Sequence, residues 1–563
     1  MLTRLLLLTS IWGAACAPAP PWVEADSSHP LVTVKNGTYA GVHSSTYDQD
    51  FFLGIPFAEP PIGDRRFANP APLAEESWDG TRDATTYSPF CVGYGWASAG
   101  YELSEDCLYL NIIRPANVEG PLPLAVWFYG GAWTQGGAPD QRYNLSFIVE
   151  RSVELGHPIM AASINYRVSV WGFLGSSEVA ESGNSNFGLR DQRLGLHWIQ
   201  ENIEAFGGDP SKVTIWGQSA GAASAGYHLL AFDGRDDGLF RNAIMQSGGP
   251  LSLDDQSRST QAVYDNLTIV AGCGDATDTL ACLRSAPFEV VNDIVNRTSA
   301  RGVWTPRIDG DLIARHSSEQ LADGSFVHVP IMIGATADEG TPYAPRNINS
   351  TEDFRQWLTG TERIPEAFAD ELVTEYPNNP LLPLSLANLP VDFTPNSSYG
   401  AEYRRVVTYV GDALFHAGRR HSARVWAENN LTSYSYYFNA IPAWGSQMDG
   451  AAHLAEIPFV MYSLEGVGWE PERVAPFEGK PESYTRLAEL VSGDWISFVS
   501  EGDPNAWEGR EEYDVPDWPV YGDQEGEKLN FVYDANVTSF VEEDNYRLEA
   551  IDLIISAMDV YDR

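Results

Sequence analysis

The residues 212–221, KVTIWGQSAG, constrain the fold of this chain more than any other stretch. An apolar run ends at Trp216, and Gly217 and Gly221 then flank Ser219. Glycine permits the backbone conformations of a sharp turn, and the small residues that follow, AGAASAGYHLL, suit a helix that packs closely behind the turn. The stretch therefore predicts a strand, a tight turn and a helix in direct succession, which is the building unit of an α/β fold.

Other strand-like runs alternate with helical patterns along the chain. Between two of them, residues 191–206 repeat apolar side chains at a spacing of four, as in Leu194 and Trp198, which indicates an amphipathic helix. This alternation predicts a central, mostly parallel sheet covered by helices, with large loop and helical insertions, in a single domain over residues 18–563. Besides 212–216, the strand-like runs are 124–128, 158–164, 242–247, 329–334 and 433–438.

The charge of the chain limits its partners. Asp and Glu number 77 and Lys and Arg 35, so the formal net charge at pH 7 is −42. A surface with this charge repels nucleic acid and anionic membranes, and we therefore expect neither as a partner. After the N-terminal segment, no run is long and apolar enough to predict a membrane span.

Residues 1–17 have the pattern of a secretory signal peptide. Arg4 supplies a short basic region, residues 5–12 form an apolar core, and small residues follow at 13–17. We therefore expect a secreted protein, either extracellular or in the lumen of the secretory pathway. Eight Asn-x-Ser/Thr sequons are candidate N-glycosylation sites: Asn36, Asn144, Asn266, Asn296, Asn349, Asn396, Asn430 and Asn536.

Four cysteines follow the signal peptide. We favour local pairing, Cys91 with Cys107 and Cys273 with Cys282, because the expected compartment is oxidising. In the chain-entropy account, closing the first loop contributes about 3 kcal/mol. Four free thiols or a zinc site are the alternatives.

The turn at 217–221 has the pattern Gly-x-Ser-x-Gly. After a strand and before a helix, this pattern is typical of a nucleophile elbow, which lifts the serine hydroxyl out of the sheet. A plain turn is the alternative. We predict that Ser219 is a nucleophile, and that the N–H of Ala220 at the start of the helix faces developing negative charge.

A second glycine-rich turn follows the run 124–128. Its residues are YGGAW, 129–133, and a glycine run at the end of a strand suits a loop that presents successive N–H groups. Gly131 and Ala132, together with Ala220, would form an oxyanion hole with three donors. By itself the stretch could equally be an ordinary turn.

Longer motifs carry a resemblance to a known family. In chain order they are FLGIPFAEPPIGDRRFANPAP, SEDCLYLNIIRP, INYRVSVWGFLG, NFGLRDQRLGLHWIQENIEAFGGDPSKVTIWGQSAG, DEGTPYAP, GAAHLAEIPFVM and FVSEGDPN. With these motifs the chain resembles the type-B carboxylesterase/lipase family, whose members include cholinesterases and fungal lipases. The resemblance implies the α/β-hydrolase fold, a small-molecule ester as substrate, and ester hydrolysis with no metal and no cofactor. It also implies the two disulfides favoured above.

The resemblance also implies an acid and a base for the serine. The acid is Glu339 in TADEGTPY and the base is His453 in GAAHLAEIPF, which gives the order Ser219, Glu339, His453. Glu339 would orient the imidazole, and His453 would take the serine proton and return it to the leaving alcohol. Asp338 beside the acid is expected to be structural.

Two more features come from comparison with the family pattern. A structural ion pair is implied between Glu105 of EDCLYLN and Arg167 of NYRVS. Many relatives carry glutamate before the nucleophile, whereas this chain has Gln218. A neutral amide lacks the charge that would attract a cationic alcohol such as choline, so uncharged or weakly polar esters are the expected substrates.

The loop 92–106 bears on the size and state of the substrate. It holds only fifteen residues, and the expected disulfide ties both ends, so we predict no large swinging lid. Trp96 in this loop and Trp133 after the glycine turn are candidate substrate contacts. An esterase of dissolved esters, rather than a lipase activated at an oil surface, is therefore expected.

Two alternatives use the same fold. The same three residues could transfer an acyl group to another alcohol, as an acyltransferase or a biosynthetic esterase of a secondary metabolite. A non-catalytic adhesion protein is the other alternative, although relatives of that kind lack the serine that is present here.

Overall fold

A computed structural model describes residues 29–74, 77–251, 257–297, 303–379, 384–390, 398–469, 474–522 and 527–563. The expected signal peptide, 1–17, lies outside the described residues.

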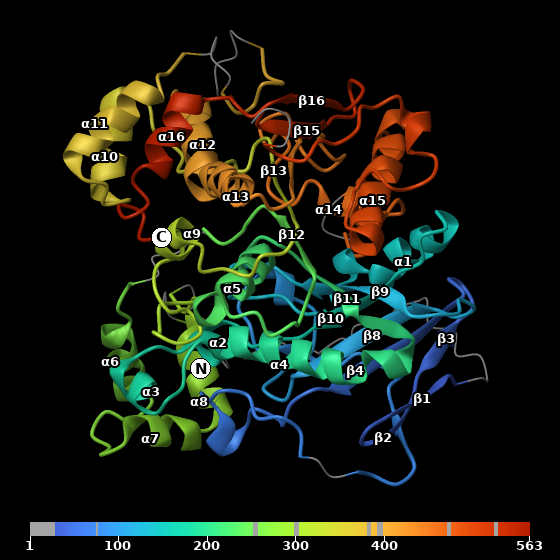
Figure 1. The fold of residues 1–563 in the computed structure, drawn as a ribbon. Helices are drawn as coiled ribbons and strands as arrows, with labels where there is room; N and C mark the ends of the chain where they lie inside the picture. The colour runs from blue at the N-terminus through green and yellow to red at the C-terminus, as the bar shows by residue number, and fades with distance from the viewer. Residues whose placement is uncertain are drawn as a thin grey trace, which may run out of the picture.

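An eleven-stranded sheet forms the centre of the fold (Figure 1). Its strand order is β16–β15–β14–β13–β12–β11–β9–β10–β8–β4–β3. The strands from β9 to β15 run parallel to one another. The pairs nearer the two edges, β10–β8, β8–β4, β4–β3 and β15–β16, are antiparallel. The strands are β3 Val42–Ser44, β4 Gln49–Pro56, β8 Tyr109–Pro115, β9 Leu122–Phe128, β10 Met160–Ile164, β11 Gly208–Gln218, β12 Asn242–Gln246, β13 Ile331–Thr336, β14 Ser433–Phe438, β15 Leu529–Tyr533 and β16 Phe540–Glu543.

The predicted sheet is confirmed, with small differences in element ends. Each of the six strand-like runs lies in a strand from β9 to β14. The helix expected at 191–206 is α4, Phe187–Asn202, followed by a 3-10 turn, Ile203–Phe206. Two small sheets, which the sequence patterns did not reveal, contain β1 Leu31–Val34, β2 Gly37–Ala40 and β5 Thr81–Asp83, and β6 Phe90–Cys91 and β7 Leu103–Ser104.

Side chains of the central strands alternate between two hydrophobic cores, one on each face of the sheet. In β9, Leu124 and Val126 belong to one core, and Ala125 and Trp127 belong to the other. Successive side chains of a strand point to opposite faces, so a strand covered on both sides reads as a continuous apolar run. Helices α4 and α5 contribute to the first core, and α1 and α15 to the second.

The helices surround this sheet, and those from α10 onward, yellow to red in Figure 1, occupy one end of the molecule. In chain order they are α1 Leu145–Glu154, α2 Ser169–Phe173, α3 Ser177–Glu181, α4 Phe187–Asn202, α5 Ala220–Gly234, α6 Gln261–Val270, α7 Thr279–Ser285, α8 Phe288–Arg297, α9 Ser317–Asp323, α10 Thr351–Gly360, α11 Glu366–Glu375, α12 Tyr403–Gly411, α13 Ala417–Glu428, α14 Ile457–Val460, α15 Glu482–Glu501 and α16 Leu548–Ile555. A π-helical turn, Asp412–His416, joins α12 to α13. Among the described residues, none of these helices has the length and apolar character needed to cross a membrane.

Candidate active site

The turn between β11 and α5 holds Ser219 in a strained backbone conformation. Its φ of 56° and ψ of −125° lie outside the regions that non-glycine residues ordinarily adopt. A Cβ at Gly217 would overlap the backbone of Gly221, and a Cβ at Gly221 would overlap the carbonyl oxygen of Phe128. The two glycines therefore let β11, α5 and the end of β9 approach closely. At this junction Ser219 is 5% exposed.

Glu339 and His453 lie in the loops that follow β13 and β14. Nδ1 of His453 is 2.6 Å from Oε2 of Glu339. Oε1 of Glu339 accepts hydrogen bonds from the hydroxyl of Ser247 at 2.5 Å and from the N–H of Thr336 at 2.8 Å. Because donors satisfy both carboxylate oxygens, Glu339 is held in place and can fix the orientation of the imidazole ring. The structure thus brings together the predicted acid and the predicted base.

Two other side chains contact the predicted nucleophile and base. Nε2 of Gln218 lies 3.2 Å from Nε2 of His453. The hydroxyl of Tyr343 interacts with the side chain of Ser219, and its ring meets the ring of His453 edge-on at a centroid distance of 5.5 Å. Sequence analysis did not identify Tyr343. Its place four residues after Glu339, in the same loop, is the signal that could have pointed to it.

The glycine-rich loop after β9 lies beside Ser219. Gly217 is opposite Phe128 in the parallel register of β11 and β9, so residues 129–133 leave the sheet next to the turn. A Cβ at Gly130 would lie 3.1 Å from the Cβ of Ser219. Only a residue without a side chain fits so close to the serine.

The three predicted oxyanion donors have free N–H groups. Gly131 and Ala132 have positive φ values, 108° and 54°, which place them in a tight turn. Ala220 is the first residue of α5, where N–H groups have no partner within the helix. In the part of the chain that the structure describes, no hydrogen bond uses the N–H of Gly131, Ala132 or Ala220.

Asp338 ties two loops of the site together. Its carboxylate accepts hydrogen bonds from the N–H of Leu386 at 2.5 Å and from the N–H of Ala451 at 2.8 Å. Burial raises the pKa of Asp338 to about 6 despite these two donors. The contacts fit the structural role expected for Asp338.

Glu456 is a second buried carboxyl group near the predicted base. Glu456 is 0% exposed, and its Oε1 accepts a hydrogen bond from Nε2 of Gln246 at 3.1 Å. Oε2 has no hydrogen-bond partner among the described residues. Burial, reinforced by the charge of Glu339, raises the pKa of Glu456 to about 7. Sequence analysis missed this residue, although it stands three positions after His453.

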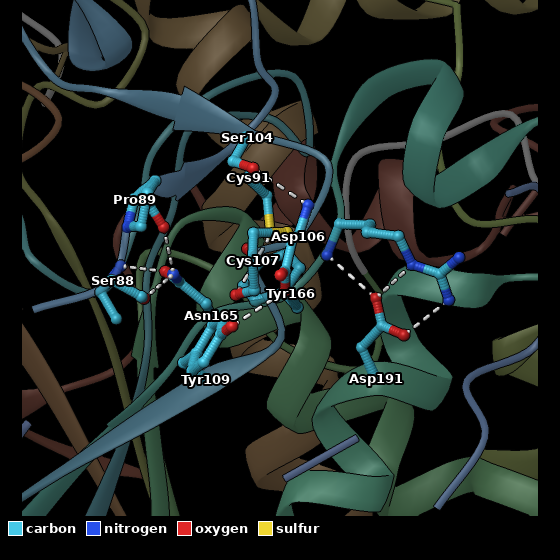
Figure 2. Close-up of a disulfide and its surroundings, with 12 residues drawn as sticks. Ser88, Pro89, Cys91, Ser104, Asp106, Cys107, Tyr109, Asn165, Tyr166 and Asp191 are labelled. Carbon is cyan, nitrogen blue, oxygen red and sulfur yellow. Dashed lines mark hydrogen bonds and ion pairs between the residues drawn. A yellow bond between two sulfur atoms is a disulfide. The ribbon is translucent and has the colours of Figure 1, made fainter. Parts of the chain in front are cut away.

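The prediction of an ion pair between Glu105 and Arg167 is wrong. Glu105 instead accepts two hydrogen bonds from the guanidinium of Arg66, at 2.6 and 2.7 Å. Arg167 pairs with Asp191 of α4, at 2.7 and 2.8 Å, and Asp191 also accepts from the backbone N–H of Arg167. Figure 2 shows Asp191 beside the Cys91–Cys107 region. Each arginine is thus held by a carboxylate that accepts two hydrogen bonds from its guanidinium.

Both expected disulfides are present in the structure. The first closes a loop that is hydrogen-bonded to residues 134 and 135. The disulfides join Cys91 to Cys107 (Figure 2) and Cys273 to Cys282. Within the first loop, the N–H of Tyr94 donates to the carbonyl of Thr134 at 2.7 Å, and the N–H of Ala97 donates to Oε1 of Gln135 at 2.8 Å. Tyr101 stacks on Phe90 at 4.0 Å.

The two candidate substrate contacts differ in their surroundings. Trp133 is 1% exposed, its indole N–H donates to the hydroxyl of Ser224, and its ring packs near Phe173 and Tyr227. The indole is enclosed by protein in this structure, and a role for Trp133 in substrate binding stays a prediction. Trp96 is 48% exposed, with the guanidinium of Arg142 over its ring at 4.2 Å. A role for Trp96 in substrate binding stays a prediction.

The eight sequons differ in their surroundings. Asn144 is buried, and its Oδ1 caps α1 by accepting from the N–H of Ser146 at 3.0 Å. Its side-chain nitrogen is buried without a hydrogen-bond partner among the described residues, and its glycosylation stays a prediction. Asn396 lies outside the described residues, and glycosylation of the other six stays a prediction: Asn36, Asn266, Asn296, Asn349, Asn430 and Asn536.

Comparison with known proteins agrees with this architecture. The sequence profile of the carboxylesterase family matches residues 28–549. The chain belongs to the carboxylesterase family. This carboxylesterase is 32% identical over 564 residues to Lipase 2 of Geotrichum candidum, and the match covers 91% of this chain and 93% of the relative.

Further relatives cover the same range. Secreted lipase 1 of Botryotinia fuckeliana is 30% identical, with 95% of this chain and 94% of the relative covered. Fumonisin B1 esterase of Sphingopyxis macrogoltabida is 31% identical, with 93% and 90% covered. The crystal structure of Aspergillus niger EstA superposes with a TM-score of 0.79 at 26% identity, over 95% of this chain and 99% of that one. The carboxylesterase therefore has the α/β-hydrolase fold and belongs to a family of carboxylic ester hydrolases.

Proposed function

We propose that this carboxylesterase hydrolyses esters through an acyl intermediate on Ser219. The observation that carries the proposal is the pairing of His453 with Glu339 at 2.6 Å, beside a serine held in a strained turn. A serine hydroxyl is a weak nucleophile without a base, and a base is effective when a third group orients it. These three residues supply all three roles.

The proposed reaction has two halves. In the first, Nε2 of His453 takes the hydroxyl proton as Oγ of Ser219 attacks the ester carbonyl, and Glu339 stabilises the imidazolium that forms. The imidazolium then gives its proton to the leaving alcohol, and the acyl group stays on the serine. In the second half, His453 takes a proton from water as its oxygen attacks the acyl carbonyl, and the imidazolium then returns that proton to Oγ of Ser219 as the bond to the acyl group breaks and the acid is released.

The negative charge of each tetrahedral intermediate needs donors that are already in place. The N–H groups of Gly131, Ala132 and Ala220 are the donors that we assign to this task. They come from the two turns that meet at Ser219, and no protein group uses them among the described residues. Fixed donors of this kind stabilise the transition state more than water does, because they need no reorganisation.

The proposed substrates are dissolved esters that are uncharged or weakly polar, and the proposed location is outside the cell. Gln218 places a neutral amide next to the predicted base, so this position offers no charge to a cationic alcohol. Two disulfides fit an oxidising compartment, and a relative at 30% identity is described as a secreted lipase.

The proposal is tested by replacing Ser219 with alanine. Without the nucleophile no acyl-enzyme forms, and we expect kcat for a simple ester to fall by at least about 10³-fold while the thermal unfolding midpoint changes little. Ser211→Ala, at an exposed position of the same strand, is the matched control and should keep full activity. Near-normal turnover of purified Ser219→Ala would refute the mechanism.

A further inference from the structure

We propose that Gln218 is a positioning residue that holds the imidazole of His453 in its neutral, proton-accepting form. The inference rests on the function proposed above and concerns how the same site is regulated by pH. It comes from the side-chain amide of Gln218, which lies against the ring nitrogen that must receive the serine proton.

The hydrogen bonds of His453 fix which end of the amide faces the ring. Nδ1 lies 2.6 Å from a carboxylate oxygen of Glu339, so the proton of the neutral imidazole is on Nδ1. Nε2 is then a bare acceptor. The amide nitrogen of Gln218, 3.2 Å away, is a donor, and its N–H group therefore points at the lone pair of Nε2.

The surroundings of Gln218 keep the amide in this place. The residue is the last of β11, it is fully buried, and the backbone of Gly130 packs against it. A Cβ at Gly130 would lie 2.7 Å from the carbonyl oxygen of Gln218 and 3.1 Å from its Oε1. The amide is therefore enclosed by protein, and its Oε1 has no hydrogen-bond partner among the described residues.

Of the groups around His453, Glu339 favours the imidazolium and the amide of Gln218 favours the neutral ring. Glu339 touches Nδ1, and Tyr343 presents the edge of its ring. Glu456 also acts on His453 through space, but its own carboxyl group is buried. Phe415, which packs on the ring at 4.9 Å, carries no charge. Among the described residues, Gln218 is the group within hydrogen-bond distance of Nε2 itself.

An amide and a carboxylate at this position have opposite effects. The N–H of the amide stabilises neutral imidazole, because protonated Nε2 has no lone pair left to accept it. A carboxylate has no donor when ionised, and it would stabilise the imidazolium instead. The native glutamine therefore lets the site keep its base at a lower pH than glutamate would.

The test compares three proteins by their rate of reaction with an uncharged organophosphonate, measured from pH 4 to 9. The rate of phosphonylation of Ser219 depends on neutral His453 and not on deacylation. In each protein the labelling rate should fall on the acid side as His453 becomes protonated, and we call this fall the acid limb. We expect the acid limb to lie about one pH unit higher in Gln218→Glu than in the wild type. At pH values well below the acid limbs of both proteins, the variant should therefore be labelled about tenfold more slowly. Gln218→Met, of similar length and without a donor, should lie between the two.

Two further results decide the inference. Glu456→Gln should leave the acid limb where it is; if this variant moves the limb instead, the ionisation belongs to Glu456 and the inference is wrong. The inference would also be wrong if the acid limb lay at the same pH in the wild type, Gln218→Glu and Gln218→Met. Near-ultraviolet circular dichroism must then show a native fold for at least one of the two variants at position 218. Failure of the wild type to react at Ser219 would instead refute the proposed function itself.

Discussion

Hydrogen bonding distinguishes the two buried carboxyl groups around His453. Glu339 is fully buried, but three donors surround its two oxygens. Glu456 is buried to the same extent with a single donor, and its pKa is raised to about 7. The predicted base therefore lies beside one buried carboxyl group with donors on both oxygens and one whose raised pKa favours the protonated form in mildly acidic solution.

Glu456→Gln should change how stability depends on pH. The native pKa of Glu456 is about 7, above its ordinary value of 4.5, so the stabilisation it brings is complete below pH 4.5 and is lost as the pH rises to 7. Glutamine does not ionise, so the stability of the variant does not decrease in this way as the pH rises. We expect the free energy of unfolding of the variant, relative to the wild type, to rise by about 3 kcal/mol between pH 4 and pH 8.

Denaturant unfolding at the two pH values measures this difference. A difference between variant and wild type that stays constant with pH would show that Glu456 has the same pKa in the folded and the unfolded protein, which would contradict the raised pKa.

Short motifs in the sequence identify residues whose catalytic roles stay predictions. Ser219 stands in a turn whose glycines are visible in the sequence, and Glu339 and His453 stand in motifs shared with the family. Glu105 was matched to the wrong arginine, because which of several nearby charges pair depends on side-chain packing that no spacing encodes. Trp133 is predicted to contact substrate from its position after the glycine turn, and its hydrogen bond to Ser224 could be seen only in three dimensions.

At the scale of elements, the close contact of β11, α5 and the end of β9 is what shapes the site. Gly221→Ala should break this contact, because the added methyl group would overlap the carbonyl oxygen of Phe128 and would lie 2.9 Å from that of Tyr129. Backbone atoms cannot move aside as a flexible side chain can. We expect a loss of about 1–3 kcal/mol in stability and a large fall in kcat.

The matched control is Gly360→Ala at the end of α10, where a Cβ would meet nothing within 4 Å. That variant should unfold within about 1 kcal/mol of the wild type and keep its activity. Equal effects of the two substitutions on stability and activity would contradict this account of the elbow.

The disulfide loop is a second element with a measurable consequence. Its backbone is tied to residues 134 and 135 as well as closed by Cys91–Cys107, so a large opening movement would break several hydrogen bonds at once. We therefore expect hydrolysis of one ester to saturate smoothly as its concentration passes the solubility limit. A sharp rise in rate once droplets form would show that an element opens at the oil surface.

At the scale of the whole molecule, the order of strands explains why residues far apart in sequence meet. The strands β11, β12, β13 and β14 are consecutive in the sheet. Ser219 follows β11, Glu339 follows β13 and His453 follows β14. Carboxyl ends of parallel strands lie at one edge, so these loops meet there. The alternation of apolar runs predicted this part of the fold.

The edges of the sheet could not be predicted in the same way. Strands β3, β4, β8 and β16 pair antiparallel, and β4 carries an irregular register against β8. Short strands of this kind have no helix between them to mark a crossover, and their partners are chosen by packing across the sheet.

The most direct test of the central claim is the site of covalent labelling by the organophosphonate, determined by mass spectrometry of the digested protein. We predict one phosphonyl group per chain, attached to Ser219, with loss of ester hydrolysis in proportion to labelling and no label in Ser219→Ala. A label on a different residue that abolishes activity, or hydrolysis that continues in the fully labelled protein, would contradict the claim that Ser219 is the nucleophile.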